Sequence, residues 1–168
     1  MIVSLLISWM PALTLFLAAV VQEMALPFSA WSVFRPDLVL ICLFYWRLYR
    51  ADRCGPILAF LTGLLVDVLS GTPLGLHAVS NIVLILVTGH FDRVFRSVDF
   101  IYVLFVILFL TCLTEGIQLA VSTVMWGPAA RWLVLAGRPV ATFLIAPMVI
   151  YGLVMVHQTW LEEPYARR

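Results

Sequence analysis

The chain has 168 residues, of which 64% are hydrophobic and only 11% are charged, against about 45–50% apolar and about 25% charged in an ordinary soluble domain. A soluble fold cannot bury that much apolar surface, so the composition predicts an integral membrane protein. The formal net charge is +1, and the ten basic residues are arginines spread through predicted loops, which excludes the basic patch of a nucleic-acid-binding protein.

Apolar segments separated by charged or turn residues predict an all-α fold of six transmembrane helices. A spanning helix needs about 20 residues, so residues 1–168 form one polytopic membrane domain with no room for a second. The predicted spans cover roughly 6–27, 36–49, 54–70, 74–91, 99–125 and 139–160. Pro36, Pro56 and Pro139 indicate helix starts, because the first N–H of a helix lacks a partner in any case. Pro11 and Pro147 fall inside spans, where we expect bends.

The distribution of arginines predicts the orientation of the bundle. Three fall on one side of the predicted spans and seven on the other; the three are Arg35, Arg131 and Arg138, and the seven are Arg47, Arg50, Arg53, Arg93, Arg96, Arg167 and Arg168. By the positive-inside rule, the side with seven arginines is cytoplasmic, and it holds both termini.

Two further features give expectations about structure. The long connection at residues 126–138 mixes apolar residues with arginines and tryptophans, and is expected to form a short interfacial helix. The three cysteines, Cys42, Cys54 and Cys112, lie in or beside apolar segments with no CxxC motif. They are therefore predicted to be small buried apolar residues and not metal ligands.

Asp67 and Glu115 are the two ionisable residues that stand out inside predicted spans, because an aspartate at the centre of a membrane helix costs about 2.5–3.5 kcal/mol. Asp67 lies near the end of the third span, on one helix face with Gly63 and Ser70. Gly71 and Gly75 follow closely. This glycine-rich stretch predicts a tight antiparallel hairpin between the third and fourth spans.

His77 begins the returning helix, and Asn81 follows one turn later. A hydrogen bond between Asp67 and His77 across the hairpin would clip the two helices together. This structural role is the leading interpretation. An ion or proton site, and a role in docking a partner or ligand, stay open as alternatives.

A polar stripe runs along the fifth predicted span. Glu115 lies near its centre, and Thr111, Gln118 and Ser122 continue the stripe at helical spacing. Such a stripe is unfavourable against lipid, so it is expected to face the bundle interior or a polar cleft. Structural hydrogen bonding and contact with a substrate or a partner helix are both open.

Signatures of catalysis are missing from the sequence, which contains no HExxH, GxSxG or P-loop motif. The histidines His77, His90 and His157 are far apart along the chain. The carboxylates of Asp67 and Glu115 are expected at different depths. The chain is therefore predicted not to be an enzyme, and no cofactor or metal site is predicted.

Two stretches resemble the bacterial rod-shape protein family MreD: VFRPDLVLICLFYW at residues 33–46 and GLLVDVLSGTPLGLHA at residues 63–78. The Arg-Pro-Asp opening of the second span and the Asp-x-x-Ser-Gly-x-x-x-Gly hairpin both stand at the separation typical of that family. The last two spans match it only in hydropathy. The residues that match the family pattern are Arg35, Pro36, Asp37, Gly63, Asp67, Gly71 and Gly75.

The resemblance implies a non-catalytic component of the Rod complex, the elongation machinery that builds side-wall peptidoglycan at the bacterial inner membrane. Proteins of this family act beside MreC, the glycosyltransferase RodA with its penicillin-binding transpeptidase, and the MreB cytoskeleton. They are similar in fold to the substrate-binding membrane subunits of energy-coupling-factor vitamin transporters. No catalytic residue is carried over, because the family offers none.

The leading hypothesis is a membrane scaffold that binds MreC and helps to organise or activate wall synthesis for rod shape. The main alternative is a vitamin-binding subunit of a transporter, suggested by fold analogy, which is weak support alone, and by the stripe around Glu115. A third, an enzyme acting on lipid, predicts loss of turnover when Asp67 or Glu115 is replaced. Arg35 and Asp37 flank Pro36, and could pair with each other, with lipid headgroups or with a partner.

Overall fold

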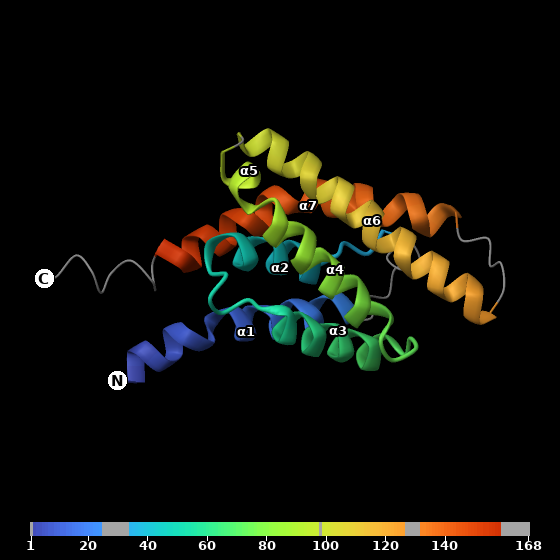
Figure 1. Cartoon of the computed structure of the whole chain (residues 1–168), viewed down its shortest axis with the longest axis horizontal. Coiled ribbons are helices and arrows are strands. Elements are labelled where there is room, and N and C mark those ends of the chain that lie inside the picture. Colours follow the sequence, from blue (N-terminus) through green and yellow to red (C-terminus); the bar gives the residue numbers. More distant parts are fainter. Residues whose placement is uncertain (1, 25–33, 98, 127–131, 159–168) are drawn as a thin grey trace, which may run out of the picture.

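The computed structural model describes residues 2–24, 34–97, 99–126 and 132–158, and within these ranges every regular element is a helix (Figure 1). The expected all-α fold is confirmed. Six of the helices overlap the six predicted spans, and the short α5 was not predicted. The helices are α1 (Ile2–Glu23), α2 (Leu38–Tyr49), α3 (Pro56–Ser70), α4 (Leu76–His90), α5 (Asp92–Ser97), α6 (Phe100–Trp126) and α7 (Trp132–His157).

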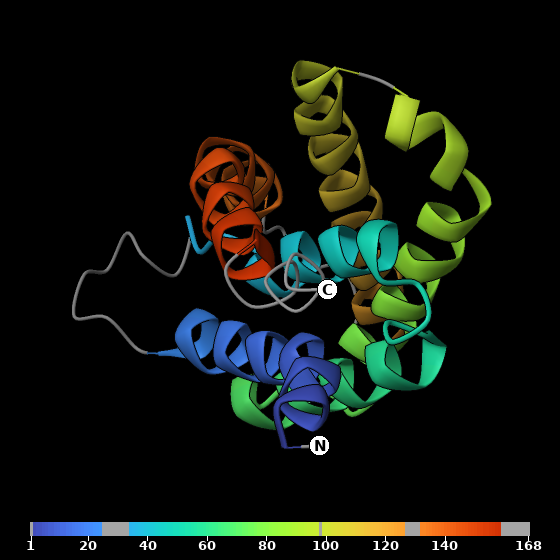
Figure 2. The same cartoon turned by 90° about the vertical axis from the view of Figure 1, so that its left-hand side faces the viewer.

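The long helices run back and forth, so that α1 begins and α7 ends at the same end of the molecule, on the left of Figure 1. The turn between α3 and α4 lies at the opposite end. In Figure 2, α2 occupies the middle of the bundle, with α1 below it and α7 beside it. Helix α2 packs against α1, α4 and α7, and α6 packs against both α4 and α7.

Helix α2 is central because its sequence is apolar around its whole circumference, which is typical of a fully enclosed helix. Nine of its twelve residues are buried. Trp46 is fully buried, and its indole Nε1–H donates a hydrogen bond of 2.7 Å to the Thr14 hydroxyl of α1. This bond satisfies the one polar atom of the indole, so that the ring fits an apolar core.

The outer helices present large apolar side chains to the surroundings. Two helical segments are long and apolar enough to cross a membrane, Phe100–Val124 and Gly137–His157, and the other apolar helices in the described ranges are shorter. Outward-facing side chains include Ile57 (77% exposed), Val124 (87%) and Met148 (79%). Such a surface suits lipid or other membrane helices.

The proline-based helix starts were partly right. Pro56 is the first residue of α3, as predicted. The predicted start at Pro139 is wrong, because α7 begins at Trp132 and contains both Pro139 and Pro147. Membrane helices tolerate internal prolines where neighbouring helices satisfy the freed carbonyl. The expected interfacial helix at residues 126–138 is not separate: residues 127–131 lie outside the described ranges, and the remainder belongs to α6 and α7.

The cysteines follow the prediction in two of three cases. Cys42 and Cys54 are buried, whereas Cys112 is exposed. The prediction for Cys112 is wrong because this residue lies on the outward face of α6, between the exposed residues Phe109 and Gly116. An apolar thiol is as well suited to a lipid-facing surface as to a core.

Helices α3 and α4 form the most extensive helix pair of the described structure, and Gly63 sets their spacing. A Cβ atom at Gly63 would lie 2.3 Å from Cα of Ala78. We therefore expect Gly63→Ala to destabilise the fold by about 1–3 kcal/mol, the usual cost of overpacking, which a lowered thermal unfolding midpoint in detergent would report.

Gly116→Ala provides the matched control for this substitution. Gly116 also lies within a membrane helix, but nothing lies within 4 Å of a Cβ atom added there. Alanine at this position is expected to be neutral or to stabilise by up to about 1 kcal/mol. Equal midpoints for the two variants would contradict the close approach at Gly63.

Candidate functional site

The carboxylate of Asp67 is fully buried near the end of α3 and holds the α3–α4 turn together. Its Oδ1 accepts hydrogen bonds from the backbone N–H of His77 at 2.9 Å and from the Thr72 hydroxyl at 3.0 Å. Its Oδ2 accepts from the N–H of Gly75 at 2.8 Å. Nδ1 of the His77 ring lies 2.8 Å from Oδ1, so the expected hydrogen bond between Asp67 and His77 is present. A carboxylate only accepts, so this ring nitrogen is the donor.

The turn itself requires glycine at two positions. Gly71 ends α3 with φ of +67°, and Gly75 precedes α4 with φ of +104°. Side chains other than glycine rarely adopt such angles. The two glycines therefore shape the loop so that its N–H groups point at Asp67.

The Arg-Pro-Asp motif anchors the start of α2 to its neighbours. Asp37 caps α2, because its Oδ1 accepts from the N–H of Leu40 at 2.9 Å. The N–H of Asp37 donates to the Thr142 hydroxyl of α7, also at 2.9 Å. Arg35 forms an ion pair with Glu23 at the end of α1. Of the open alternatives, a pair between Arg35 and Asp37 is wrong, because each side chain has its own partner within the chain.

Glu115 and Arg138 form a buried ion pair between α6 and α7. Glu115 Oε1 lies 2.7 Å from Arg138 Nη1, and the two side chains are 7% and 13% exposed. Oε1 makes no aligned hydrogen bond to any described residue, so charge attraction dominates the contact. Thr111 and Gln118 are also buried, whereas Ser122 is half-buried. The stripe from Thr111 to Gln118 therefore faces the bundle interior, as expected.

The hairpin and the ion pair lie on helices that pack against each other, because α4 carries His77 and contacts α6, which carries Glu115. Figure 1 shows that α6 extends beyond the end of the α3–α4 hairpin. The expectation that Asp67 and Glu115 lie at different depths in the membrane stays a prediction.

We call these buried groups, taken together, the buried polar network. Ion pairs and hydrogen bonds join α1, α6, α7 and the start of α2 through Glu23, Arg35, Asp37, Glu115, Arg138 and Thr142. A separate hydrogen bond joins Asp67 of α3 to His77 of α4.

A buried amide lies next to this network on α4. Asn81 is only 7% exposed, and its Nδ2 has no hydrogen-bond partner among the described residues. Gln118 is buried on α6, and α4 packs against α6. A buried amide donor normally has a partner, so this part of the helix interface has hydrogen-bonding capacity for water, a ligand or another chain.

The geometry of the buried polar network favours rigid positioning over bond-making chemistry. Each of its carboxylates, Glu23, Asp37, Asp67 and Glu115, is engaged by a cation or by N–H donors. Across residues 2–24, 34–97, 99–126 and 132–158, no group of three or more His, Cys, Asp or Glu side chains is placed to hold a metal ion. The arrangement fixes the relative positions of the helices on which it lies.

Sequence reasoning missed the partners contributed by α1 and α7. Glu23 and Gln22 end α1, and Gln22 Oε1 accepts from the N–H of Val39 at 3.1 Å. The sequence pattern places Arg138 in a loop, and no motif marks Thr142. One signal was available: a glutamate in mid-span needs a cation, and only three arginines lie on that side of the predicted bundle.

The opposite end of the molecule carries surface ion pairs instead. In the loop between α2 and α3, Arg50 and Arg53 approach Asp52 at 3.3 and 3.4 Å. The hydrogen bond from Arg50 holds the pKa of the Asp52 carboxyl below its usual value. Exposed pairs of this kind contribute at most about 1 kcal/mol, so the structurally important charges lie in the buried polar network.

Comparison with known proteins identifies the family. No solved structure matches the chain, so the expected likeness to the substrate-binding subunits of vitamin transporters stays a prediction. A family model described as rod shape-determining protein MreD matches residues 4–156 of the 168. The chain therefore belongs to the MreD family, whose members are membrane proteins that take part in determining rod shape.

Proposed function

We propose that this chain is a non-catalytic scaffold of the elongation complex in the bacterial inner membrane. In this role it binds MreC and helps to organise or activate peptidoglycan synthesis by RodA and its penicillin-binding transpeptidase. It acts together with the MreB cytoskeleton. Residues 1–168 form a single domain in which six helices span the bilayer. The residues of the family motif, Arg35 to Asp37 and Gly63 to Gly75, maintain the fold that presents the binding surface.

The observation that carries this proposal is the apolar outer surface of a chain that belongs to the MreD family. Val124 on α6, Leu144 on α7 and Ile57 on α3 are each at least 69% exposed. The buried polar network holds the helices beneath them in fixed positions. A rigid apolar surface of this kind supports recognition of a partner's membrane helix, which depends on close side-chain packing.

Photo-crosslinking in living cells tests the scaffold directly. A photoreactive amino acid is placed, one at a time, at Val124, Leu144 and Ile57, which sample three different faces of the bundle. We expect an adduct with MreC from at least one face and not from all three, together with rounding of rod-shaped cells when the chain is depleted. Recovery of no MreC adduct from any position would refute the proposed contact.

The same proposal places both termini in the cytoplasm. Arg47, Arg50, Arg53 and Arg93 lie at the end of the molecule where α1 begins and α7 ends, and arginine-rich loops stay on the cytoplasmic side. A C-terminal fluorescent protein that folds only in the cytoplasm should therefore glow, and a C-terminal alkaline phosphatase should stay inactive. The reverse pair of results would invert the proposed orientation.

The buried amide of Asn81 on α4, whose Nδ2 has no hydrogen-bond partner among the described residues, is the observation that favours the alternative function. A vitamin-binding transporter subunit would use such a group to orient its ligand. This alternative requires uptake of a vitamin that depends on the chain, and co-purification of a transporter coupling subunit. Those results without recovery of MreC would replace the scaffold with the transporter.

A further inference from the structure

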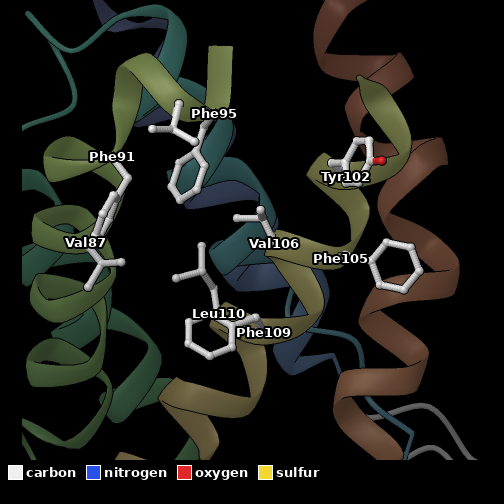
Figure 3. A pocket seen from close by; sticks show the side chains of 9 residues that line it. Val87, Phe91, Phe95, Tyr102, Phe105, Val106, Phe109 and Leu110 are labelled. Atoms are coloured by element: carbon white, nitrogen blue, oxygen red, sulfur yellow. The ribbon is translucent and has the colours of Figure 1, made fainter. Parts of the chain in front are cut away.

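An apolar groove that shares no residue with the buried polar network lies between the end of α4, the short α5 and the first half of α6 (Figure 3). Its volume is about 460 Å³, within the range of about 300–1,000 Å³ that is typical of small-molecule sites. Val87 and Phe91 line one wall and Val106 the other, with Phe95 of α5 above them. No residue of its lining carries a charge.

The groove opens on the outside of the bundle. Its edge residues are exposed, with Phe91 at 46%, Val94 at 54%, Tyr102 at 58% and Phe105 at 56%. In a membrane protein an opening lined in this way faces hydrocarbon rather than water. It lies at the end of the bundle that holds the start of α1 and the end of α7 (Figure 1), and therefore within the leaflet on that side.

A cation adjoins the groove along the chain. Arg93 of α5 immediately precedes the groove residue Val94, and its side chain is exposed. It forms no ion pair with any residue that the structure describes. Arginine near a membrane surface attracts the phosphates of anionic lipids. The combination of an uncharged groove and a neighbouring free cation complements an amphiphile that has a hydrocarbon chain and a negatively charged head.

We propose that this groove binds one hydrocarbon chain of an anionic phospholipid, whose phosphate pairs with Arg93. The size of the groove favours this occupant over a partner helix, because a helix needs an apolar face many turns long, whereas here α5 closes the end of the cavity. The site is separate from the buried polar network. Lipid binding in the groove can therefore be tested independently of the proposed scaffold function.

Native mass spectrometry of the purified full chain in detergent tests the proposal. Vesicles of phosphatidylglycerol serve as the anionic probe, and vesicles of phosphatidylcholine as the neutral one. We expect one phosphatidylglycerol to stay bound per chain under conditions that strip other lipids. Phosphatidylcholine should be retained at least about fivefold less, which corresponds to roughly 1 kcal/mol at one charged contact.

Substitutions on both walls separate binding in the groove from general lipid contact. Val106→Trp and Val87→Trp fill the groove from α6 and α4, and each should abolish the retained lipid. Val140→Trp adds the same ring at a 52% exposed position on α7, and should leave retention unchanged. Arg93→Gln should keep lipid binding but remove the preference for phosphatidylglycerol. Circular dichroism establishes that each variant is folded.

Three outcomes would overturn the proposal. Equal retention by the groove-filling variants and Val140→Trp would mean that only the general lipid annulus is bound. An unchanged preference for phosphatidylglycerol in Arg93→Gln would remove the assigned headgroup contact. The third outcome is that MreC displaces the lipid from the wild type and that a photoreactive residue at Val106 crosslinks to MreC. This result would assign the groove to a partner helix.

Discussion

Replacing Asp67 with alanine is expected to lower the free energy of unfolding by about 3–5 kcal/mol, because each buried donor left without an acceptor costs about 1–3 kcal/mol. The donors are the backbone N–H groups of Gly75 and His77, the hydroxyl of Thr72 and Nδ1–H of the His77 ring. For a chain of this size, each kcal/mol shifts the thermal midpoint by about 2–4 °C. The midpoint in detergent should therefore fall by roughly 10 °C, as measured by circular dichroism.

Two variants show whether the loss at Asp67 comes from the hydrogen-bonded clip. Asp67→Asn keeps one acceptor oxygen and should be destabilised less than Asp67→Ala. Asp52→Ala removes a carboxylate that is 60% exposed, and should stay within about 0.5 kcal/mol of the wild type. If the Asp67→Ala and Asp52→Ala variants have the same thermal midpoint, Asp67 does not hold the hairpin.

The second large effect is expected at the ion pair of Glu115 and Arg138. Removing one partner leaves a buried charge uncompensated, which costs about 3–5 kcal/mol. Glu115→Gln and Arg138→Gln should therefore each be strongly destabilised. The double variant should be more stable than the sum of the two losses predicts, because neither charge remains. Thermal unfolding of the wild type and the three variants gives the coupling energy of the pair.

The exposed pair of Arg50 and Asp52 provides the control for this cycle. Its side chains are 26% and 60% exposed, and such pairs contribute at most about 1 kcal/mol. The coupling energy measured at Glu115 and Arg138 should therefore be several times larger. Equal coupling energies in the two cycles would show that the buried pair does not join α6 to α7.

The hairpin could be predicted from the sequence because its determinants are local. Asp67 and His77 are ten residues apart, and the two glycines between them favour a sharp turn. Turn chemistry, helix periodicity and the cost of a buried carboxylate all act over that distance. These signals are sufficient to predict both the shape of the loop and the hydrogen bond that closes it.

The rest of the buried polar network depends on contacts between distant parts of the chain. Asp37 and Thr142 are 105 residues apart, and nothing near Asp37 indicates which hydroxyl its N–H will meet. The partner of Glu115 was missed for the same reason. Arg138 was assigned to a loop because Pro139 suggested a helix start, whereas packing against α2 and α6 supports an α7 that begins earlier.

The composition of an apolar segment is also a poor guide to which of its side chains are exposed. Cys112 and Cys42 both stand in apolar runs, yet one is exposed and the other buried. In water an apolar side chain has a strong preference for the interior, but a lipid environment largely removes this preference. Hydropathy therefore predicts which segments enter the bilayer better than which face of each segment meets lipid.

The short α3–α4 hairpin beside the long α6 has a consequence for the surrounding lipid. Fifteen residues of α3 rise about 22 Å and the 27 residues of α6 about 40 Å, whereas the hydrocarbon core of a bilayer is about 30 Å thick. In the proposed six-span arrangement, the membrane would be compressed along the side of α3, while on the other side α6 would tilt or thicken it. This hydrophobic mismatch would attract membrane proteins with short spans to the side of α3 and proteins with long spans to the side of α6. The chain would thus sort its neighbours in the membrane by the length of their spans.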